Sequence, residues 1–341
     1  MSSDTIVVTG TAGFIGFHLA EKLLHAGKQV IGIDCVSDYY DVNLKEARLD
    51  RLKQHQGFVE RRINLEDETA VEQTFRDHRP EACVNLAAQA GVRYSIENPR
   101  AYMRANMDGF LNILEACRAF PVKHLVYAST SSVYGANTAM PFEADGPTEH
   151  PLTLYAATKK SNEMMAHAYA NLFGIPSTGM RFFTVYGPWG RPDMALFLFT
   201  KAIIEGKPIN VFNNGNMKRD FTYVADIVQG ISKLIDVPAI IDTSWNSDKP
   251  NADTSGVAPY RVVNIGNSRC EKLTRYIEVL EDKLGKKAEW NMLPMQDGDV
   301  PATWANTDTL SKLTGYAPDT PIETGIGNFV DWYLDFYNIK R

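Results

Sequence analysis

Hydrophobic and polar positions follow two alternating periods along the first half of the chain. Short apolar runs with a β-branched bias predict buried strands, and apolar residues at helical spacing predict the helices between them. The expected strands are Thr5–Thr9, Gln29–Asp34, Phe58–Ile63, Ala82–Leu86, His124–Ser129 and Ser177–Phe182. The expected helices are Gly13–Ala26, Asn43–Lys53, Glu68–His78, Pro99–Phe120 and Thr153–Phe173. This alternation predicts an α/β fold, a Rossmann-type doubly wound parallel sheet covered by helices on both faces.

The pattern loosens beyond Arg191, where prolines interrupt it and Ile240–Pro259 is a polar stretch typical of an exposed excursion. Helices are expected again at Leu273–Leu284 and Pro321–Tyr337. We therefore expect a larger nucleotide-binding lobe over residues 1–183. A smaller, interleaved C-terminal α/β lobe should lie mainly within residues 184–341, with some segments returning to the larger lobe.

Composition and charge narrow the class of protein. The 341 residues are 44% apolar and 22% charged, and the formal net charge is −6 with no basic run, so no nucleic-acid partner is expected. The four cysteines lie far apart and the seven histidines form no metal-binding motif, so no metal is expected. No run of 18 apolar residues predicts a membrane span, and the first strand leaves no room before it for a signal peptide. We expect a soluble, cytoplasmic protein.

Three glycines, Gly10, Gly13 and Gly16, follow the first expected strand. At this spacing Gly10 permits a tight turn, Gly13 lets the backbone approach a diphosphate, and Gly16 lets helix and sheet pack closely. Unpaired N–H groups at the start of the helix then form an anion site. Glycines are common in ordinary turns, so the interpretation depends on the strand before and the helix after.

Asp34 closes the second expected strand. A carboxylate in this place accepts hydrogen bonds from adenosine ribose hydroxyls and repels the extra phosphate of NADP. NAD is therefore the expected cofactor, and an ordinary turn with a solvated aspartate is the weaker alternative.

Tyr155 and Lys159 are four residues apart and share one face of an expected helix. A free phenol has a pKa of about 10, so a tyrosine base near pH 7 needs that pKa lowered by roughly 3, at a cost of about 4 kcal/mol. A nearby ammonium and a bound nicotinamide cation both favour the phenolate. The same spacing is common on ordinary amphipathic helices, so the neighbouring motifs decide.

Hydroxyls follow the strand His124–Ser129, at Thr130, Ser131 and Ser132. The carboxyl ends of parallel strands face the ligand crevice. A hydroxyl there can bond to the substrate oxygen whose proton Tyr155 removes.

Together these motifs resemble the extended short-chain dehydrogenase/reductases, and more narrowly their nucleotide-sugar 4-epimerases. The resemblance runs from about Thr5 to Tyr337 and includes Leu86–Ala90 and Ser129–Gly135. It implies that Tyr155 is the base, that Lys159 tunes it and anchors the nicotinamide ribose, and that Thr130 is the hydroxyl partner. Ser129 is the alternative to Thr130, and counting back from Val133–Gly135 favours Thr130.

The resemblance also implies a tightly bound NAD that is regenerated within each cycle. The cofactor contacts that it implies are Gly10, Gly13, Phe14, Ile15, Gly16, Asp34, Asn64, Leu65, Leu86, Ala87, Ala88, Gln89, Tyr155 and Lys159.

Ser131 and Ser132 bear on the type of reaction. Relatives that catalyse 4,6-dehydration carry an Asp-Glu pair at these positions, and decarboxylating relatives usually carry a Glu at the second. A serine cannot act as a general acid near pH 7, so elimination is disfavoured. The expected reaction is oxidation at C4 and return of the hydride to the opposite face of the sugar.

The segment Arg181–Met194 resembles the loop with which UDP-glucuronate 4-epimerases bind the C6 carboxylate, using a Thr and an Arg seven residues later. These residues map to Thr184 and Arg191, and a guanidinium holds a carboxylate in two hydrogen bonds. Arg219 is expected to neutralise phosphate, and Asp299 to accept from the UDP ribose. The full set of implied substrate contacts is Ser131, Ser132, Thr184, Arg191, Val211, Phe212, Arg219 and Asp299.

The expected function is therefore C4 epimerisation of UDP-glucuronate to UDP-galacturonate, for surface polysaccharide biosynthesis. A UDP-glucose or UDP-N-acetylglucosamine 4-epimerase is the nearest alternative. A non-catalytic NAD-binding protein is less favoured, because Thr130, Tyr155 and Lys159 are all intact. The resemblance also implies a homodimer through the two long helices. Their apolar positions fit either that interface or the core within one chain: Ile113, Leu114, Met164 and Met165.

Overall fold

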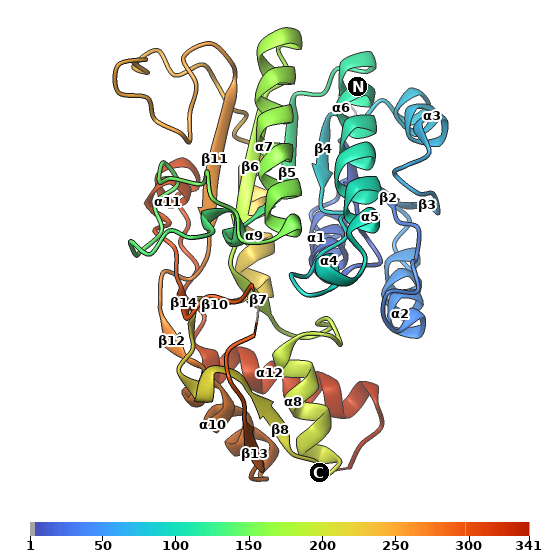
Figure 1. Cartoon of the computed structure of the whole chain (residues 1–341). Coiled ribbons are helices and arrows are strands. Elements are labelled where there is room, and N and C mark those ends of the chain that lie inside the picture. The colour runs from blue at the N-terminus through green and yellow to red at the C-terminus, as the bar shows by residue number, and fades with distance from the viewer. Residues whose placement is uncertain (1–3, 297, 341) are drawn as a thin grey trace.

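A seven-stranded parallel sheet forms the centre of the larger lobe in the computed structural model, which describes residues 4–296 and 298–340 (Figure 1). Its strand order is β11-β6-β5-β4-β1-β2-β3. These strands are β1 (Thr5–Thr9), β2 (Gln29–Ile33), β3 (Phe58–Arg61), β4 (Ala82–Asn85), β5 (His124–Thr130), β6 (Ser177–Phe182) and β11 (Tyr260–Ile265). Since the order runs outward in both directions from β1, the sheet is doubly wound, as the sequence predicts.

Helices follow the strands of the larger lobe and recur in the smaller lobe. The α-helices are α1 (Phe14–His25), α2 (Val42–Lys53), α3 (Glu68–His78), α4 (Tyr94–Glu97), α5 (Pro99–Tyr102), α6 (Gly109–Ala119), α7 (Leu154–Phe173), α8 (Ala195–Ile204), α9 (Val224–Ile235), α10 (Leu273–Leu284), α11 (Asp308–Thr314) and α12 (Ile322–Phe336). Three segments have other helical forms: the π-helix η1 (Met103–Asp108) and the 3-10 helices η2 (Ser131–Tyr134) and η3 (Phe212–Gly215). Within residues 4–296 and 298–340, every helix is too short or too polar to cross a membrane.

Both faces of the central sheet are buried, which explains its continuous apolar strands. Successive residues of a strand point to opposite faces. Val8 and Val126 pack in the core that α1 and α9 cover, whereas Val7 and Leu125 pack in the core that α3, α6 and α7 cover. The strands are thereby fixed in register, and their carboxyl ends face the smaller lobe.

The smaller lobe packs α8, α10 and α12 around an aromatic core, in which the rings of Phe221 and Tyr276 stack 3.9 Å apart. Strand β11 lies beyond residue 184 and yet pairs with β6, so the C-terminal part of the chain completes the large sheet. The remaining strands are β7 (Thr184–Tyr186), β8 (Ile209–Val211), β9 (Lys218–Arg219), β10 (Phe221–Tyr223), β12 (Glu271–Lys272), β13 (Trp290–Met292) and β14 (Ala302–Thr303).

The helix predicted at Pro99–Phe120 is the one predicted element of the first half that differs in kind. It consists of α5, the π-helix η1 and α6. The wide turn places Asn106 so that its side chain bonds to the backbone N–H and carbonyl of Gln89, at 2.9 and 3.0 Å. It also leaves the Asn106 carbonyl free to accept from Asn162 at 2.7 Å. The irregular turn therefore joins α7 to the segment that follows β4.

Candidate active site

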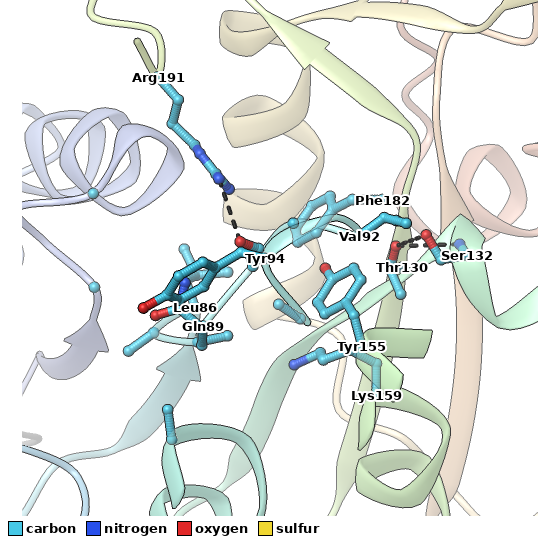
Figure 2. Close-up of a pocket in the computed structure, with 18 of the residues that line it drawn as sticks. Leu86, Gln89, Val92, Tyr94, Thr130, Ser132, Tyr155, Lys159, Phe182 and Arg191 are labelled. Atoms are coloured by element: carbon cyan, nitrogen blue, oxygen red, sulfur yellow. Dashed lines mark hydrogen bonds between the residues drawn. The ribbon is translucent and has the colours of Figure 1, made fainter. Parts of the chain in front are cut away.

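A cavity of about 850 Å³ lies at the carboxyl ends of the strands, between the two lobes. This volume is in the range of cofactor and ligand pockets, and the switch point of a doubly wound sheet is where such pockets occur. Every residue that the sequence predicted for the site lines the cavity, except Val211 and Phe212. Figure 2 shows Thr130, Tyr155, Lys159 and Arg191 around it.

The glycine turn forms a cradle that side chains would fill. Gly10 has φ +79°, in the left-handed region that favours glycine. A Cβ on Gly13 would lie 2.9 Å from the Gly10 carbonyl oxygen, and a Cβ on Gly16 would clash with the same oxygen. Helix α1 starts at Phe14, and no side chain caps it. Its first N–H groups can therefore bind a diphosphate.

Asp34 follows β2 and is held by the backbone. Its carboxylate accepts from Ala12 N at 2.9 Å and from Val36 N at 2.8 Å. Burial raises the pKa of Asp34, and these two N–H groups act in the opposite direction. Each oxygen still has a lone pair for a ribose hydroxyl.

Arg48 of α2 joins the glycine turn to the loop that carries Arg191. It is completely buried, and its guanidinium donates to the Ala12 carbonyl at 2.6 Å. The same group donates to the carbonyls of Trp189 and Gly190, at 2.6 and 3.1 Å. The two sides of the cavity are thus tied by one cation.

Helix α7 carries Tyr155 and Lys159. Thr153 caps the helix by accepting from Ala156 N at 3.2 Å, which places Tyr155 in the first turn. Lys159 lies one turn later and is only 2% exposed. Burial lowers the pKa of Lys159 to about 8, and the charge of Glu163 acts against this.

The surroundings of Tyr155 alone do not make it a base. Burial raises the pKa of its phenol above the usual value, and a hydrogen bond with Thr130 and the charge of Arg191 offset this only in part. Without a further positive charge, the phenol therefore stays protonated near pH 7.

The structure distinguishes Thr130 from Ser129. The Thr130 hydroxyl accepts from Ser132 N at 3.2 Å and lies beside Tyr155 in the cavity wall (Figure 2). The Ser129 hydroxyl is buried and donates to Glu163 at 2.7 Å. Ser129 also lines the cavity, but its hydroxyl proton is already given to Glu163, so Thr130 is the hydroxyl available to a ligand.

Arg191 and Thr184 line the cavity on the side of the smaller lobe. Arg191 already has a carboxylate partner, because its Nε and Nη2 donate to Asp193 at 3.0 and 2.6 Å. Burial acts against the charge of Arg191, but Asp193 outweighs it and raises the pKa of the guanidinium. Arg191 is therefore a permanent cation in the cavity wall.

The other predicted substrate contacts fall into two groups. Arg219 and Asp299 line the cavity and attract each other electrostatically. The side chain of Val211 is instead fully enclosed in the core of the smaller lobe, so it cannot touch a ligand. Phe212 is not among the lining residues, and its ring centre lies 5.4 Å from the guanidinium of Arg93, which does line the cavity.

The cavity-lining residues that escaped the sequence analysis include Tyr39, Lys45, Arg93 and Arg104. Arg93 follows the Leu86–Ala90 segment, and its position shortly after the end of a strand could have predicted that it lines the cavity. Lys45 is buried on α2 and donates to the Ser37 carbonyl at 2.6 Å. Helix periodicity alone assigns such a lysine to the surface.

The model of the NAD dependent epimerase/dehydratase family matches residues 6–246. The chain belongs to this family. Protein CapI of Staphylococcus aureus is 54% identical over 332 residues, which cover 97% of this chain and 99% of that protein. A probable UDP-glucuronate 4-epimerase of Rhizobium meliloti is 50% identical over 331 residues, 97% of either chain.

Solved structures agree with this family membership. UDP-glucuronic acid 4-epimerase from Bacillus cereus, in complex with UDP-glucuronic acid and NAD, has a TM-score of 0.86 and 32% identity to this chain. The match covers 98% of this chain and 100% of that one. The protein is thus an NAD-dependent nucleotide-sugar 4-epimerase, and its glycine cradle and Asp34 fit that cofactor.

A methyl group on the glycine turn should prevent cofactor binding. We expect Gly16→Ala to lose bound NAD, because its Cβ would clash with the Gly10 carbonyl and displace the turn. Gly327→Ala is the matched control, since its Cβ would meet only Lys283, at 3.4 Å. The measurement is the NAD content of the purified proteins. A Gly16→Ala protein with a full complement of NAD would contradict this role of the turn.

Proposed function

We propose that the chain is a UDP-glucuronate 4-epimerase, which inverts C4 of UDP-glucuronate to give UDP-galacturonate. The observation that carries this proposal is the position of Arg191, in the same cavity as Tyr155 and Lys159. In this proposal residues 1–183 bind NAD, and residues 184–341 mainly bind the UDP-sugar.

Recognition of the acidic sugar is assigned to Arg191 and Thr184. Asp193 accepts from Nε and Nη2 of the guanidinium, and the Ala90 carbonyl accepts from Nη2 at 3.5 Å, which leaves the N–H groups of Nη1 for a substrate carboxylate. The Thr184 hydroxyl adds a donor from β7 on the same side of the cavity. A charge-assisted pair of hydrogen bonds of this kind is worth more than the contacts of a neutral hydroxymethyl group.

The proton chemistry is assigned to Tyr155. Bound NAD supplies a reversible hydride acceptor and a positive charge. With that charge and the Lys159 ammonium present, Tyr155 can take the proton of the 4-hydroxyl while the hydrogen at C4 leaves as hydride. The Thr130 hydroxyl forms a hydrogen bond with the same sugar oxygen and keeps that oxygen in place. Tyr155 returns the proton after the 4-keto sugar has turned and taken the hydride back on its other face.

The residues next to Thr130 support epimerisation over elimination. Ser131 and Ser132 contribute only hydroxyls to the cavity wall, and the Ser132 hydroxyl accepts from Thr130 at 3.3 Å. Neither provides an acid for a departing hydroxyl group. The ketone is therefore left to be reduced again.

The first test is product formation. Purified protein given UDP-glucuronate and no added cofactor should form UDP-galacturonate, which chromatography of the UDP-sugars measures. Tyr155→Phe should lower kcat by about 10²- to 10⁴-fold, since it removes the acid–base group, and should keep its NAD. Tyr169→Phe is the control, because this hydroxyl on the same helix bonds to Glu115 on the exterior. An active Tyr155→Phe protein would exclude the proposed base.

The second test is sugar specificity. One observation favours the alternative substrates, the neutral UDP-hexoses. Arg191 already forms an ion pair with Asp193, so its charge is neutralised before any substrate carboxylate binds. If Arg191 binds the substrate carboxylate, Arg191→Ala should lower kcat/KM for UDP-glucuronate about 100-fold, the loss of a charge-assisted hydrogen-bond pair. Its effect on UDP-glucose should be only a few-fold. Arg275→Ala, in an exposed pair with Glu323, is the control. Equal losses on both sugars would favour the neutral-sugar alternative.

We also propose a homodimer through α6 and α7, which lie side by side on one face of the larger lobe (Figure 1). Ile113 and Leu114 are fully buried within the chain and are not available. Met103, Leu111, Met164, Leu172 and Phe173, on or next to these two helices, are 39–68% exposed and give this face several apolar side chains. Covering these side chains with a second copy would remove them from water.

The third test is the oligomeric state. The double substitution Met164→Glu and Leu172→Glu should convert a dimer to a monomer, because it buries two like charges from each copy in an apolar contact. Light scattering after gel filtration measures the mass. Ile240→Glu, at an apolar side chain that is 76% exposed elsewhere, should leave the mass unchanged. A monomeric wild-type protein would exclude this interface.

A further inference from the structure

Glu163 is a carboxylate sealed beneath the cavity. It lies on α7 one turn beyond Lys159 and two turns beyond Tyr155, and its exposure is 0%. Both oxygens are saturated: Arg181 donates to them from Nε and Nη2, each at 2.9 Å. The Ser129 hydroxyl donates at 2.7 Å, and Lys160 at 3.2 Å.

These bonds join the three elements that carry the reacting groups. Ser129 immediately precedes Thr130 on β5, so its bond to Glu163 fixes the end of that strand against α7. Arg181 on β6 extends the contact, because it also donates to the Tyr134 hydroxyl at 3.1 Å. Tyr134 ends the helix η2 that begins at Ser131. Displacing Glu163 would therefore loosen the Thr130 segment relative to Tyr155.

The charge of Glu163 also acts on Lys159. Burial lowers the pKa of Lys159 to about 8, and Glu163 is the charge that raises it again. The ionisable groups on α7 near this pair are Tyr155 and Lys160. Those on other elements are Arg181 on β6, Tyr127 on β5, Tyr134 on η2, Tyr260 on β11, Tyr102 on α5, whose ring is 6.0 Å from that of Tyr155, and Arg191 across the cavity. Of these groups, Glu163 is the one whose charge raises the pKa of Lys159.

A fully buried ion pair is seldom needed for stability alone. The desolvation of two charges offsets much of their attraction, and apolar residues of similar size often serve a fold as well or better. The pair Glu163–Arg181 nevertheless lies directly under the reacting groups, with 0% exposure on both side chains.

We propose that Glu163 is a positioning residue for the reaction: it fixes the Thr130 segment through Ser129, and its charge keeps the Lys159 ammonium protonated beside Tyr155. This inference rests on the proposed function of Tyr155 and Lys159. The ammonium is present below its pKa and is lost as the pH rises through it. Activity should therefore fall on the alkaline side of about pH 8 in the wild-type protein.

The test is the pH profile of kcat for Glu163→Gln, which keeps the shape of the side chain. We expect kcat at pH 8 to fall about fivefold, with the alkaline limb moved to lower pH by about one unit and KM within about twofold of wild type. Lys160→Met is the control. It removes another partner of the same carboxylate, on a side chain that is 21% exposed, and should leave the profile in place.

A second variant keeps the test decisive if the unpaired Arg181 destabilises Glu163→Gln. The double variant Glu163→Gln with Arg181→Gln removes both charges, and we expect the same displaced alkaline limb. The inference would be overturned if the alkaline limb of the kcat profile stayed at the wild-type pH in a variant that folds and keeps its NAD. That result would leave the proposed function unaffected. The role of Tyr155 as the base is tested separately, by the activity of the Tyr155→Phe protein.

Discussion

A lysine ammonium held almost out of water is the constraint around which the rest of the site is arranged. Lys159 is 2% exposed, and an isolated buried cation is costly unless charges or hydrogen bonds compensate it. The compensation comes from Glu163 on the same helix, whose own charge is balanced by Arg181 from the neighbouring strand. In the proposed mechanism, the positive charge beside the Tyr155 base is thus maintained by the packing of α7 against β5 and β6.

The two sides of the cavity are coupled through backbone carbonyls. Arg48 reaches from α2 to Ala12 in the glycine turn and to Trp189 and Gly190 before Arg191. One buried side chain thus links parts of the site that come from both halves of the chain.

The sequence predicted the larger lobe well because its elements are regular and local. Each strand and helix expected before residue 183 is present to within two residues at either end, apart from the π-helical turn within Pro99–Phe120. That turn depends on Asn106 bonding to Gln89 and Asn162, contacts that no local period encodes. Beyond Arg191, prolines obscured α8 and α9, although Val224, Ile227 and Ile231 have helical spacing and are buried.

The candidate site was predictable where a motif fixes a backbone position, as with Gly10, Tyr155 and Lys159. It was not predictable where a side chain arrives from a distant element. No sequence motif around Arg48 or Glu163 distinguishes these residues from surface charges on a helix. Only the folded chain brings them beneath the cavity. Val211 shows the converse, because its segment resembles a ligand-binding one while its side chain belongs to the core.

The hydrogen bonds of Asp34 make the cofactor preference of the pocket difficult to change by a single substitution. Its two oxygens accept from the N–H groups of Ala12 and Val36, so the group that we expect to discriminate against a 2′-phosphate also supports the glycine turn. Exchanging it for a small neutral residue, the usual first step toward accepting NADP, would remove that support along with the repulsion. Evolution or engineering of the other dinucleotide preference would have to rebuild the turn at the same time.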